Sequence, residues 1–339
     1  MIMDVETARL PGTHRYAAAE LALSSRSVWR ATRNASARRV LPDPYGLAVD
    51  DGEIPRRVAL VVHPSRPLSG ALETLDAWAS RHDVDVVQVP VDGNERRVRP
   101  LHDVAQGDLV VALGGDGTAL SALRAAAAVE APVLAVACGS VGALSAVSAG
   151  ELRGALDRMQ GGDWTTYALP ALAIETDGAP DELALNDFVV VRRGAGQVLA
   201  EVAVDGDLYV RFAGDGLIVA TPFGSSGYMM AAGGPLLCVG TQAFVCSLLA
   251  MHGGSAAPLV VPADAALTID VRPSYAGFNV EIDGHRSALD ARTYRLTLRQ
   301  NKARLVSVSR SDQRLHRLRE RGLIADSPRV LIRDQRAAR

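Results

Sequence analysis

The sequence has few aromatic residues and almost no net charge. Phenylalanine, tryptophan and tyrosine make up 4% of the 339 residues, and 36 lysines and arginines stand against 38 aspartates and glutamates. A net charge of −2 gives no global field that would draw the chain to nucleic acid or to acidic lipid. An anionic small molecule would therefore be bound by local geometry, such as glycine turns and helix N-termini.

Cysteines and long apolar runs are also scarce. The three cysteines, Cys138, Cys238 and Cys246, are isolated in apolar contexts, and their spacing fits no zinc module, so we expect buried free thiols. No run approaches the ~18 apolar residues that a membrane helix needs. The N-terminus carries acids and a proline where a signal peptide has an apolar core. These absences predict a cytoplasmic protein with no membrane partner.

Composition divides the chain into four segments. We expect an N-terminal extension over 1–54, an α/β domain over 55–163, a β-rich domain over 164–305, and a C-terminal helix and tail over 306–339. The extension has Ala/Arg-rich helical spacing that a proline-containing stretch breaks, which is typical of an arm that packs on a partner subunit. Its basic residues are thinly spread and lack the aromatic interleaving of a nucleic-acid tail.

Short β-branched runs alternate with helical periodicity in the first domain. Strands are expected at 58–62, 84–89, 108–113 and 132–137, and helices at 69–81 and 118–128. This alternation predicts βαβ units around a parallel sheet.

The second domain is predicted to be mostly β, because short apolar runs are separated by Gly, Asp and Pro turns. Its strands are expected at 171–175, 183–191, 198–204, 217–221, 267–271, 278–282 and 294–298. Asp-Gly pairs at 205–206 and 283–284 predict hairpins. A charged helix over 310–321 is expected to precede a frayed end.

A Gly-Gly-Asp-Gly-Thr run at 114–118 lies between a predicted strand and a predicted helix. Ligands bind at this end of parallel strands, and glycines leave bare N–H groups that face phosphate. Asp116 cannot pair with phosphate, so we expect it to face a hydroxyl or a metal. The run differs from the G-x-G-x-x-G fingerprint of dinucleotide oxidoreductases and from the phosphate loop that ends in Gly-Lys-Ser/Thr.

A second candidate site spans 214–228 and continues to 235. A predicted strand there is followed by a turn rich in glycine and hydroxyl groups, which can present backbone N–H groups to a polar ligand together with Thr221, Ser225, Ser226 and Tyr228. Taken alone, the same segment also fits an ordinary turn with a serine that caps the following helix.

These segments together resemble the NAD kinase family, which transfers phosphate from a nucleoside triphosphate to the adenosine ribose of NAD. The resemblance runs from about 58 to 306, with anchors at 109–120, 183–195, 214–228 and 232–237. It implies a two-domain fold, an α/β domain with a parallel sheet followed by a mostly β domain, with the site between them.

The resemblance also implies a role for each site residue. Asp116 matches the catalytic acid that deprotonates the 2′-hydroxyl. Gly114, Gly115, Gly117 and Thr118 would cradle the triphosphate of ATP, and Mg²⁺ would arrive with the nucleotide. Residues that match the acceptor side are Ala143, Asn186, Asp187, Asp215, Thr221, Ser226, Gly227, Tyr228 and His252. In the family the residue matching Asp215 reaches a dinucleotide on a neighbouring subunit, which implies a homodimer or homotetramer.

Departures from the family pattern gather on the acceptor side. Small residues stand where the family has larger or polar ones, at Ala119, Ala137, Ala143, Gly227 and Ala231, and Asp187 replaces a glutamate. Three alternatives follow: an NAD kinase with relaxed binding, a related phosphotransferase acting on another nucleotide, nucleoside or polyol, or a non-catalytic nucleotide-binding regulator.

Three histidines are weaker candidates. His63 could approach phosphate or lie in a solvated loop, His252 could bind or merely pack, and His285 adjoins an Asp-Gly turn. No set of His, Cys and Asp has the spacing of a metal cage, so we expect no protein-held metal.

Overall fold

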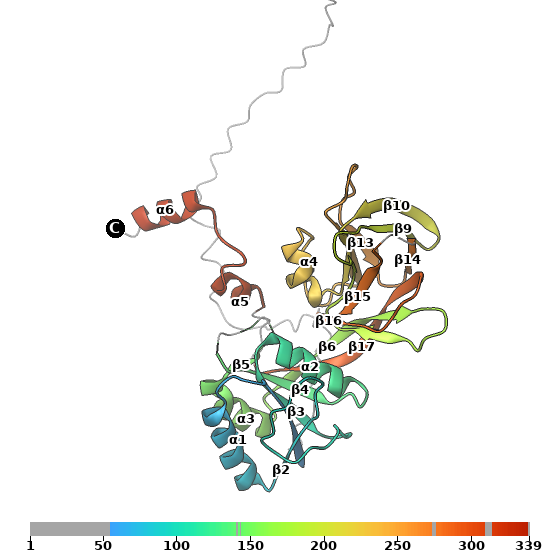
Figure 1. Cartoon of the computed structure of the whole chain (residues 1–339). Helices are drawn as coiled ribbons and strands as arrows, with labels where there is room; N and C mark the ends of the chain where they lie inside the picture. Colours follow the sequence, from blue (N-terminus) through green and yellow to red (C-terminus); the bar gives the residue numbers. More distant parts are fainter. Residues whose placement is uncertain (1–54, 140–141, 143, 273–275, 309–313, 338–339) are drawn as a thin grey trace, which may run out of the picture. The chain divides into compact units, whose positions relative to one another are not determined.

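The computed structural model describes residues 55–139, 142, 144–272, 276–308 and 314–337 (Figure 1). The predicted helical arm of the extension lies outside these residues. Their strands form two sheets, one of 11 strands and one of 6.

The parallel part of the larger sheet has the order β4-β3-β1-β2. These strands are β1 (Arg57–Val62), β2 (Asp85–Gln88), β3 (Leu109–Gly114) and β4 (Pro132–Ala137). The central strands β3 and β4 are apolar on both faces, as strands with helices on both sides must be, whereas the edge strand β2 carries Asp85 and Gln88. Along β1, Val58 and Leu60 enter one core cluster and Ala59 and Val61 the other.

Helices cover both faces of this part. Helices α1 (Ser69–His82) and α3 (Leu152–Gln160) share one cluster, and α2 (Asp116–Ala127) shares the other. The predicted βαβ pattern is confirmed in outline. Helix α3 was not predicted, and neither were the short strand β5 (Val147–Ser148) and the 3₁₀ turn η1 (Ala149–Glu151).

The rest of the chain is mostly β. Its strands in the larger sheet are β6 (Thr165–Glu175), β7 (Glu182–Ala184), β9 (Val198–Val204), β10 (Asp207–Gly214), β14 (Leu267–Arg272) and β17 (Thr293–Ser307). The smaller, antiparallel sheet contains β8 (Asp187–Arg192), β11 (Gly216–Ala220), β12 (Ala243–Leu249), β13 (Leu259–Pro262), β15 (Phe278–Ile282) and β16 (His285–Arg286). Side chains from both sheets form one core around Phe188, Phe244, Tyr294 and Leu296.

Strand β17 belongs to both parts of the molecule. It pairs antiparallel with β14 over its first residues and with β6 along most of its length, and Arg304 and Leu305 near its end pair parallel with Pro132 and Val133 of β4. The larger sheet is therefore continuous from the parallel strands into the β-rich part. The strand was predicted only at 294–298, and it ends beyond the predicted boundary at 305.

The C-terminal segment forms two helices, α5 (Arg314–Glu320) and α6 (Pro328–Ala337). Helix α5 lies within the predicted helix 310–321, whereas the expected fraying of the last residues was wrong over α6. Cys138 and Cys246 are buried as predicted, but Cys238 is exposed, so the expectation of burial was wrong there. Among the described residues, no helix is long and apolar enough to cross a membrane.

Candidate active site

The glycine turn connects β3 directly to α2. Gly114 ends the strand, Gly115 caps the helix, and Asp116 is the first helical residue, two positions before the predicted helix start at 118. A Cβ on Gly114 would overlap the buried side chain of Thr118, so only glycine lets the turn close. The carboxylate is thus carried by the rigid first turn of a helix, where the helix dipole favours negative charge.

The carboxylate of Asp116 has defined neighbours. Oδ1 accepts a hydrogen bond from the backbone N–H of Leu144 at 3.0 Å, and Nη1 of Arg321 lies 3.2 Å from Oδ2. A Cβ on Gly142 would overlap this carboxylate, so the chain passes as close as a glycine allows. The side chain of Asp116 is 33% exposed.

Asp116 lines two cavities. One, of about 830 Å³, includes Gly115, Gly117 and Thr118 in its wall, and we name it the glycine-turn pocket. The other, of about 500 Å³, includes Asn186, Ser226 and Gly227, and we name it the loop pocket. One carboxylate therefore faces two spaces, each large enough for part of a nucleotide.

Basic side chains line the glycine-turn pocket. Arg66, Arg124 and Arg286 line it together with His63 and His285, against two acidic residues, Asp92 and Asp116. Nη1 of Arg66 donates to the carbonyl of Cys138 at 3.2 Å, beside Gly139 and Gly115. A cationic wall next to bare glycine backbone is suited to a polyphosphate.

His63 shapes the loop after β1. Its Nδ1 accepts hydrogen bonds from the backbone N–H groups of Ser65 and Arg66, each at 3.1 Å. Burial lowers the pKa of His63, and the nearby Arg66 and Arg96 lower it further. The imidazole is therefore neutral at pH 7, with the proton on Nε2.

The loop pocket is built around Asn186. Its Oδ1 is buried and has no hydrogen-bond partner among the described residues. Buried polar atoms are normally hydrogen-bonded, so this oxygen is a candidate acceptor for a donor group of a ligand. A Cβ on Gly224 would overlap the backbone of Asn186, so this glycine lets the loop after β11 press against it. Thr221 is fully buried, and its hydroxyl bonds the carbonyl of Leu185 and the N–H of Gly224. Thr221 thus shapes the loop from inside.

Two carboxylates lie buried behind Asn186. Asp283 accepts hydrogen bonds from the backbone N–H groups of Leu185 and Asn186, which explains why the predicted strand 183–191 is interrupted at these residues. Burial, with Asp283 and Glu281 adding repulsion, raises the pKa of Asp187 to about 7. Asp187 is near half protonation at neutral pH.

Three further predicted residues are not among those that line the two pockets. Asp215 forms an ion pair with Arg192 at 2.6 Å, His252 lies 3.9 Å from Asp215, and Tyr228 is 44% exposed on α4 (Tyr228–Ala231). Ala143 lies outside the described residues. Asp116, Asn186, Ser226 and Gly227 are brought together in the loop pocket.

Sequence reasoning missed the C-terminal contribution to this site. Arg321 and Leu323 line the loop pocket. Buried Arg314 donates hydrogen bonds to the carbonyl of Phe223 and to Oγ of Ser226 in the loop after β11. Arg321 is separated from Asp116 by 205 residues, and no spacing rule connects them. The sequence predicted only a charged helix over 310–321, with no contact to the glycine turn.

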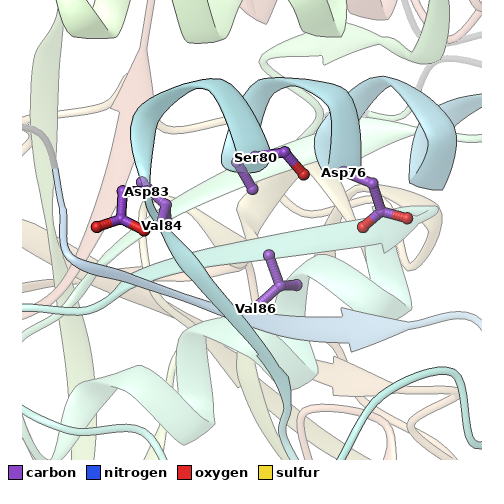
Figure 2. Close-up of a pocket in the computed structure, with 6 residues that line it drawn as sticks. Asp76, Ser80, Asp83, Val84 and Val86 are labelled. Atoms are coloured by element: carbon purple, nitrogen blue, oxygen red, sulfur yellow. The ribbon is translucent and has the colours of Figure 1, made fainter.

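A separate cavity of about 220 Å³ lies between α1 and β2, lined by Asp76, Ser80, Asp83, Val84 and Val86 among others (Figure 2). Asp76 is bound there by Arg99. This cavity shares no residue with the two pockets at Asp116. Among the described residues, no group of three or more His, Cys, Asp or Glu side chains is placed to hold a metal ion.

Comparison with known families matches both parts of the chain. The ATP-NAD kinase N-terminal domain matches residues 62–164, and the ATP-NAD kinase C-terminal domain matches residues 185–309. The NAD kinase of Koribacter versatilis is 33% identical over 240 residues, which cover 68% of this chain and 84% of the relative. The NAD kinase of Heliobacterium modesticaldum is 37% identical over 245 residues, covering 67% and 84%.

Solved structures share the fold. Yeast NADH kinase complexed with NADH superposes with a TM-score of 0.69 at 19% identity, covering 85% of this chain and 94% of that one. An NAD kinase from Archaeoglobus fulgidus in complex with ATP gives 0.60 at 23% identity, covering 77% and 96%. The predicted fold class, an α/β domain with a parallel sheet followed by a mostly β domain, is confirmed.

Proposed function

Because the chain belongs to the NAD kinase family, we propose that it transfers the terminal phosphate of ATP to the 2′-hydroxyl of the adenosine ribose of NAD and so forms NADP. One observation carries the mechanism: Asp116 lines both the glycine-turn pocket and the loop pocket. A general base for this reaction must lie between the phosphate donor and the acceptor hydroxyl, and the carboxylate of Asp116 lies at such a position.

Asp116 accepts the proton of the hydroxyl as its oxygen attacks the γ-phosphorus of ATP. The new O–P bond forms, the bond from phosphorus to the β,γ-bridging oxygen breaks, and its electron pair leaves with ADP. The hydrogen bond from Leu144 holds one carboxylate oxygen, so Asp116 is oriented before the substrates arrive. Positioning of this kind is the main contribution of a protein to phosphoryl transfer.

The glycine-turn pocket is assigned to the donor. Gly115, Gly117 and Thr118 line it beside Arg66 and Arg124, which supports binding of the triphosphate there. Mg²⁺ is a substrate component that arrives with ATP and neutralises charge on the phosphate oxygens.

The loop pocket is assigned to the acceptor ribose and its base. The unpartnered Oδ1 of Asn186 is suited to an N–H or O–H of the nucleoside. Of the residues that depart from the family pattern, Ala119 and Ala137 are buried in the sheet and its helix, whereas Gly227 and Ala231 line this pocket. Membership of the NAD kinase family favours NAD over an unrelated acceptor.

In the family, the residue that matches Asp215 reaches a dinucleotide held by a neighbouring subunit. We therefore propose that this protein forms at least a dimer. Asp215 is 38% exposed and is not among the residues that line the two pockets, which is compatible with action on a dinucleotide held by another subunit. The predicted cytoplasmic location stays a prediction.

The test is an acceptor screen with ATP and Mg²⁺ over NAD, NADH, nucleosides and polyols. Asp116→Asn is expected to lower kcat by ~10²–10⁴, the usual contribution of a general base, while both substrates still bind. Asp76→Asn is the matched control, because it makes the same change at the unrelated cavity and should leave turnover unchanged. Near-normal turnover in Asp116→Asn would show that Asp116 is not the general base. Nucleotide binding without phosphate transfer in the wild type would favour a non-catalytic nucleotide-binding regulator.

A further inference from the structure

Arg321 is held at the site by a well-anchored element. Arg314, at the start of α5, is buried and donates to the carbonyls of Pro222 and Phe223 and to Oγ of Ser226. Leu318 on the same helix is fully buried in the core that also contains α2. The helix is thereby fixed to the loop that forms the loop pocket, and its end delivers Arg321 beside Asp116.

The guanidinium of Arg321 lies beside the carboxylate without covering it. Nη1 is 3.2 Å from Oδ2 of Asp116, and the side chain of Arg321 is 40% exposed and that of Asp116 33% exposed. Arg321 lines the loop pocket together with Leu323, and the cavity remains about 500 Å³ with Arg321 in its wall. A guanidinium has five N–H donors, so the group that contacts Asp116 can bind further oxygens in the pocket.

We propose that Arg321 binds the phosphoryl group as it arrives on the acceptor hydroxyl and holds it in the product. The inference rests on the proposed function, because Asp116 contacts the hydroxyl that becomes the phosphate ester. The transferred group carries negative charge onto the acceptor side, while the proton taken by Asp116 removes charge from the carboxylate. Arg321 is thus released from its carboxylate partner at the step in which a phosphate, which it can bind bidentately, appears beside it.

This role makes Arg321 a catalytic residue that acts from the acceptor side. An arginine that stabilises transferring phosphoryl oxygens contributes ~10³–10⁵ to kcat in other phosphotransferases. Here part of that contribution is shared with the glycine turn, so we expect Arg321→Ala to lower kcat by ~10²-fold or more. The KM for ATP should change little, because the donor lies on the other side of Asp116.

The experiment compares binding of NAD and NADP to the full chain by calorimetric titration. These ligands differ only in the 2′-phosphate, so their affinity ratio isolates the group that Arg321 is proposed to bind. In Arg321→Ala we expect NADP binding to weaken at least ~10-fold more than NAD binding. Arg321→Lys should recover part of the NADP affinity, because it restores the charge without the planar fork. Arg319→Ala is the matched control, since Arg319 is on the same helix and pairs with Asp326.

Several outcomes overturn the inference. Equal weakening of NAD and NADP would give Arg321 only a structural role. Faster turnover or tighter NAD binding in Arg321→Ala would show that the ion pair blocks the acceptor. If Arg321→Ala does not fold, Arg321→Gln decides on the same ratio. A wild type that forms no NADP overturns the proposed function itself, whereas a wild type that forms NADP with an unchanged ratio in the variants overturns only the role of Arg321.

Discussion

Asp116 has almost no free volume on the side where the chain of Gly142 passes. The carboxylate is held there by the N–H of Leu144, and a Cβ at Gly142 would occupy the same space as the carboxylate. The orientation of the proposed base therefore depends on the absence of a side chain at Gly142.

Gly142→Ala should displace the carboxylate of Asp116 and lower kcat at least ~10-fold, because misplacement of a reacting group by about 1 Å costs up to 10²-fold. The check is steady-state turnover together with a melting curve. Gly154→Ala is the control: a Cβ there meets nothing within 4 Å on helix α3, so it should leave turnover unchanged and stabilise the helix. Full activity in Gly142→Ala would mean that the chain at this point can move away at no cost.

Asp187 has a different constraint, because its carboxyl is 7% exposed and has Asp283 close by. Its pKa rises from 3.8 in the unfolded chain to about 7 in the fold. The folded state therefore holds this proton more tightly. The stabilisation is complete below pH ~4 and is lost as the pH rises to about 7.

Asp187→Asn should flatten this dependence. Between pH 5 and pH 8 the free energy of unfolding of the wild type should fall relative to that of the variant, by roughly 2 kcal/mol, since one pKa unit corresponds to ~1.4 kcal/mol and linkage is incomplete over this range. Urea unfolding of both proteins at pH 5 and pH 8 measures the difference. If the free energy of unfolding of the wild type, relative to that of the variant, is the same at both pH values or is higher at pH 8, Asp187 is charged in the folded state.

At the scale of elements, helix α5 is joined to the loop after β11, which lines the loop pocket, by the buried guanidinium of Arg314. Arg314 is 5% exposed and satisfies the carbonyls of Pro222 and Phe223, whose ring also lies 5.7 Å from the guanidinium carbon. Loop and helix are therefore one structural unit, although 91 or 92 positions separate the bonded residues.

Arg314→Met should destabilise the protein by ~2–4 kcal/mol, because it removes the buried charge-assisted hydrogen bonds that Arg314 donates to the carbonyls of Pro222 and Phe223 and to Oγ of Ser226. The KM for the acceptor should rise, and that for ATP should not, because the loop forms only the loop pocket. Chemical unfolding and initial-rate kinetics test the two effects. Arg329→Met on α6 is the control, since Arg329 is exposed. An unchanged KM for the acceptor would show that helix α5 does not determine the conformation of this loop.

The sequence predicted some elements to the residue but missed others, including the apolar strand β12. Strands β4, β9 and β15 begin and end where their β-branched runs do. Strand β17 could not be predicted in full, because its second half contains a charged stretch, a bulge between Arg299 and Ala303, and Asn301 at a φ of 55°. Pairing with β6 and β4 imposes the strand there, and a single sequence window does not contain these partners.

Prediction of the site divided in the same way. Asp116 and its glycines form a local motif, so their placement at the end of a parallel strand followed from the sequence. The cationic side chains did not: Arg66, Arg124 and Arg321 come from three elements and meet only through the fold. Long-range contacts of this kind leave no periodic signal.

At the scale of the whole molecule, the shared strand β17 should make unfolding cooperative. Leu296→Ala removes a fully buried side chain from the β-rich core and should destabilise by ~2–5 kcal/mol. Trp78 and Trp164 lie in the other core, next to the parallel sheet. In a Trp29→Phe background, the fluorescence of these two residues should report the same loss as circular dichroism. A fluorescence transition that Leu296→Ala does not shift would show that the two parts unfold separately.

Strand β17 also limits how such a protein can evolve. The last strand of the β-rich part supplies the neighbour that β4 requires, so each part is incomplete without the other's backbone. Recombination that exchanged either part for a foreign counterpart would leave an unpaired sheet edge unless the incoming gene segment also encoded a matching final strand. Exchange of one part alone would therefore remove a pairing partner of the other.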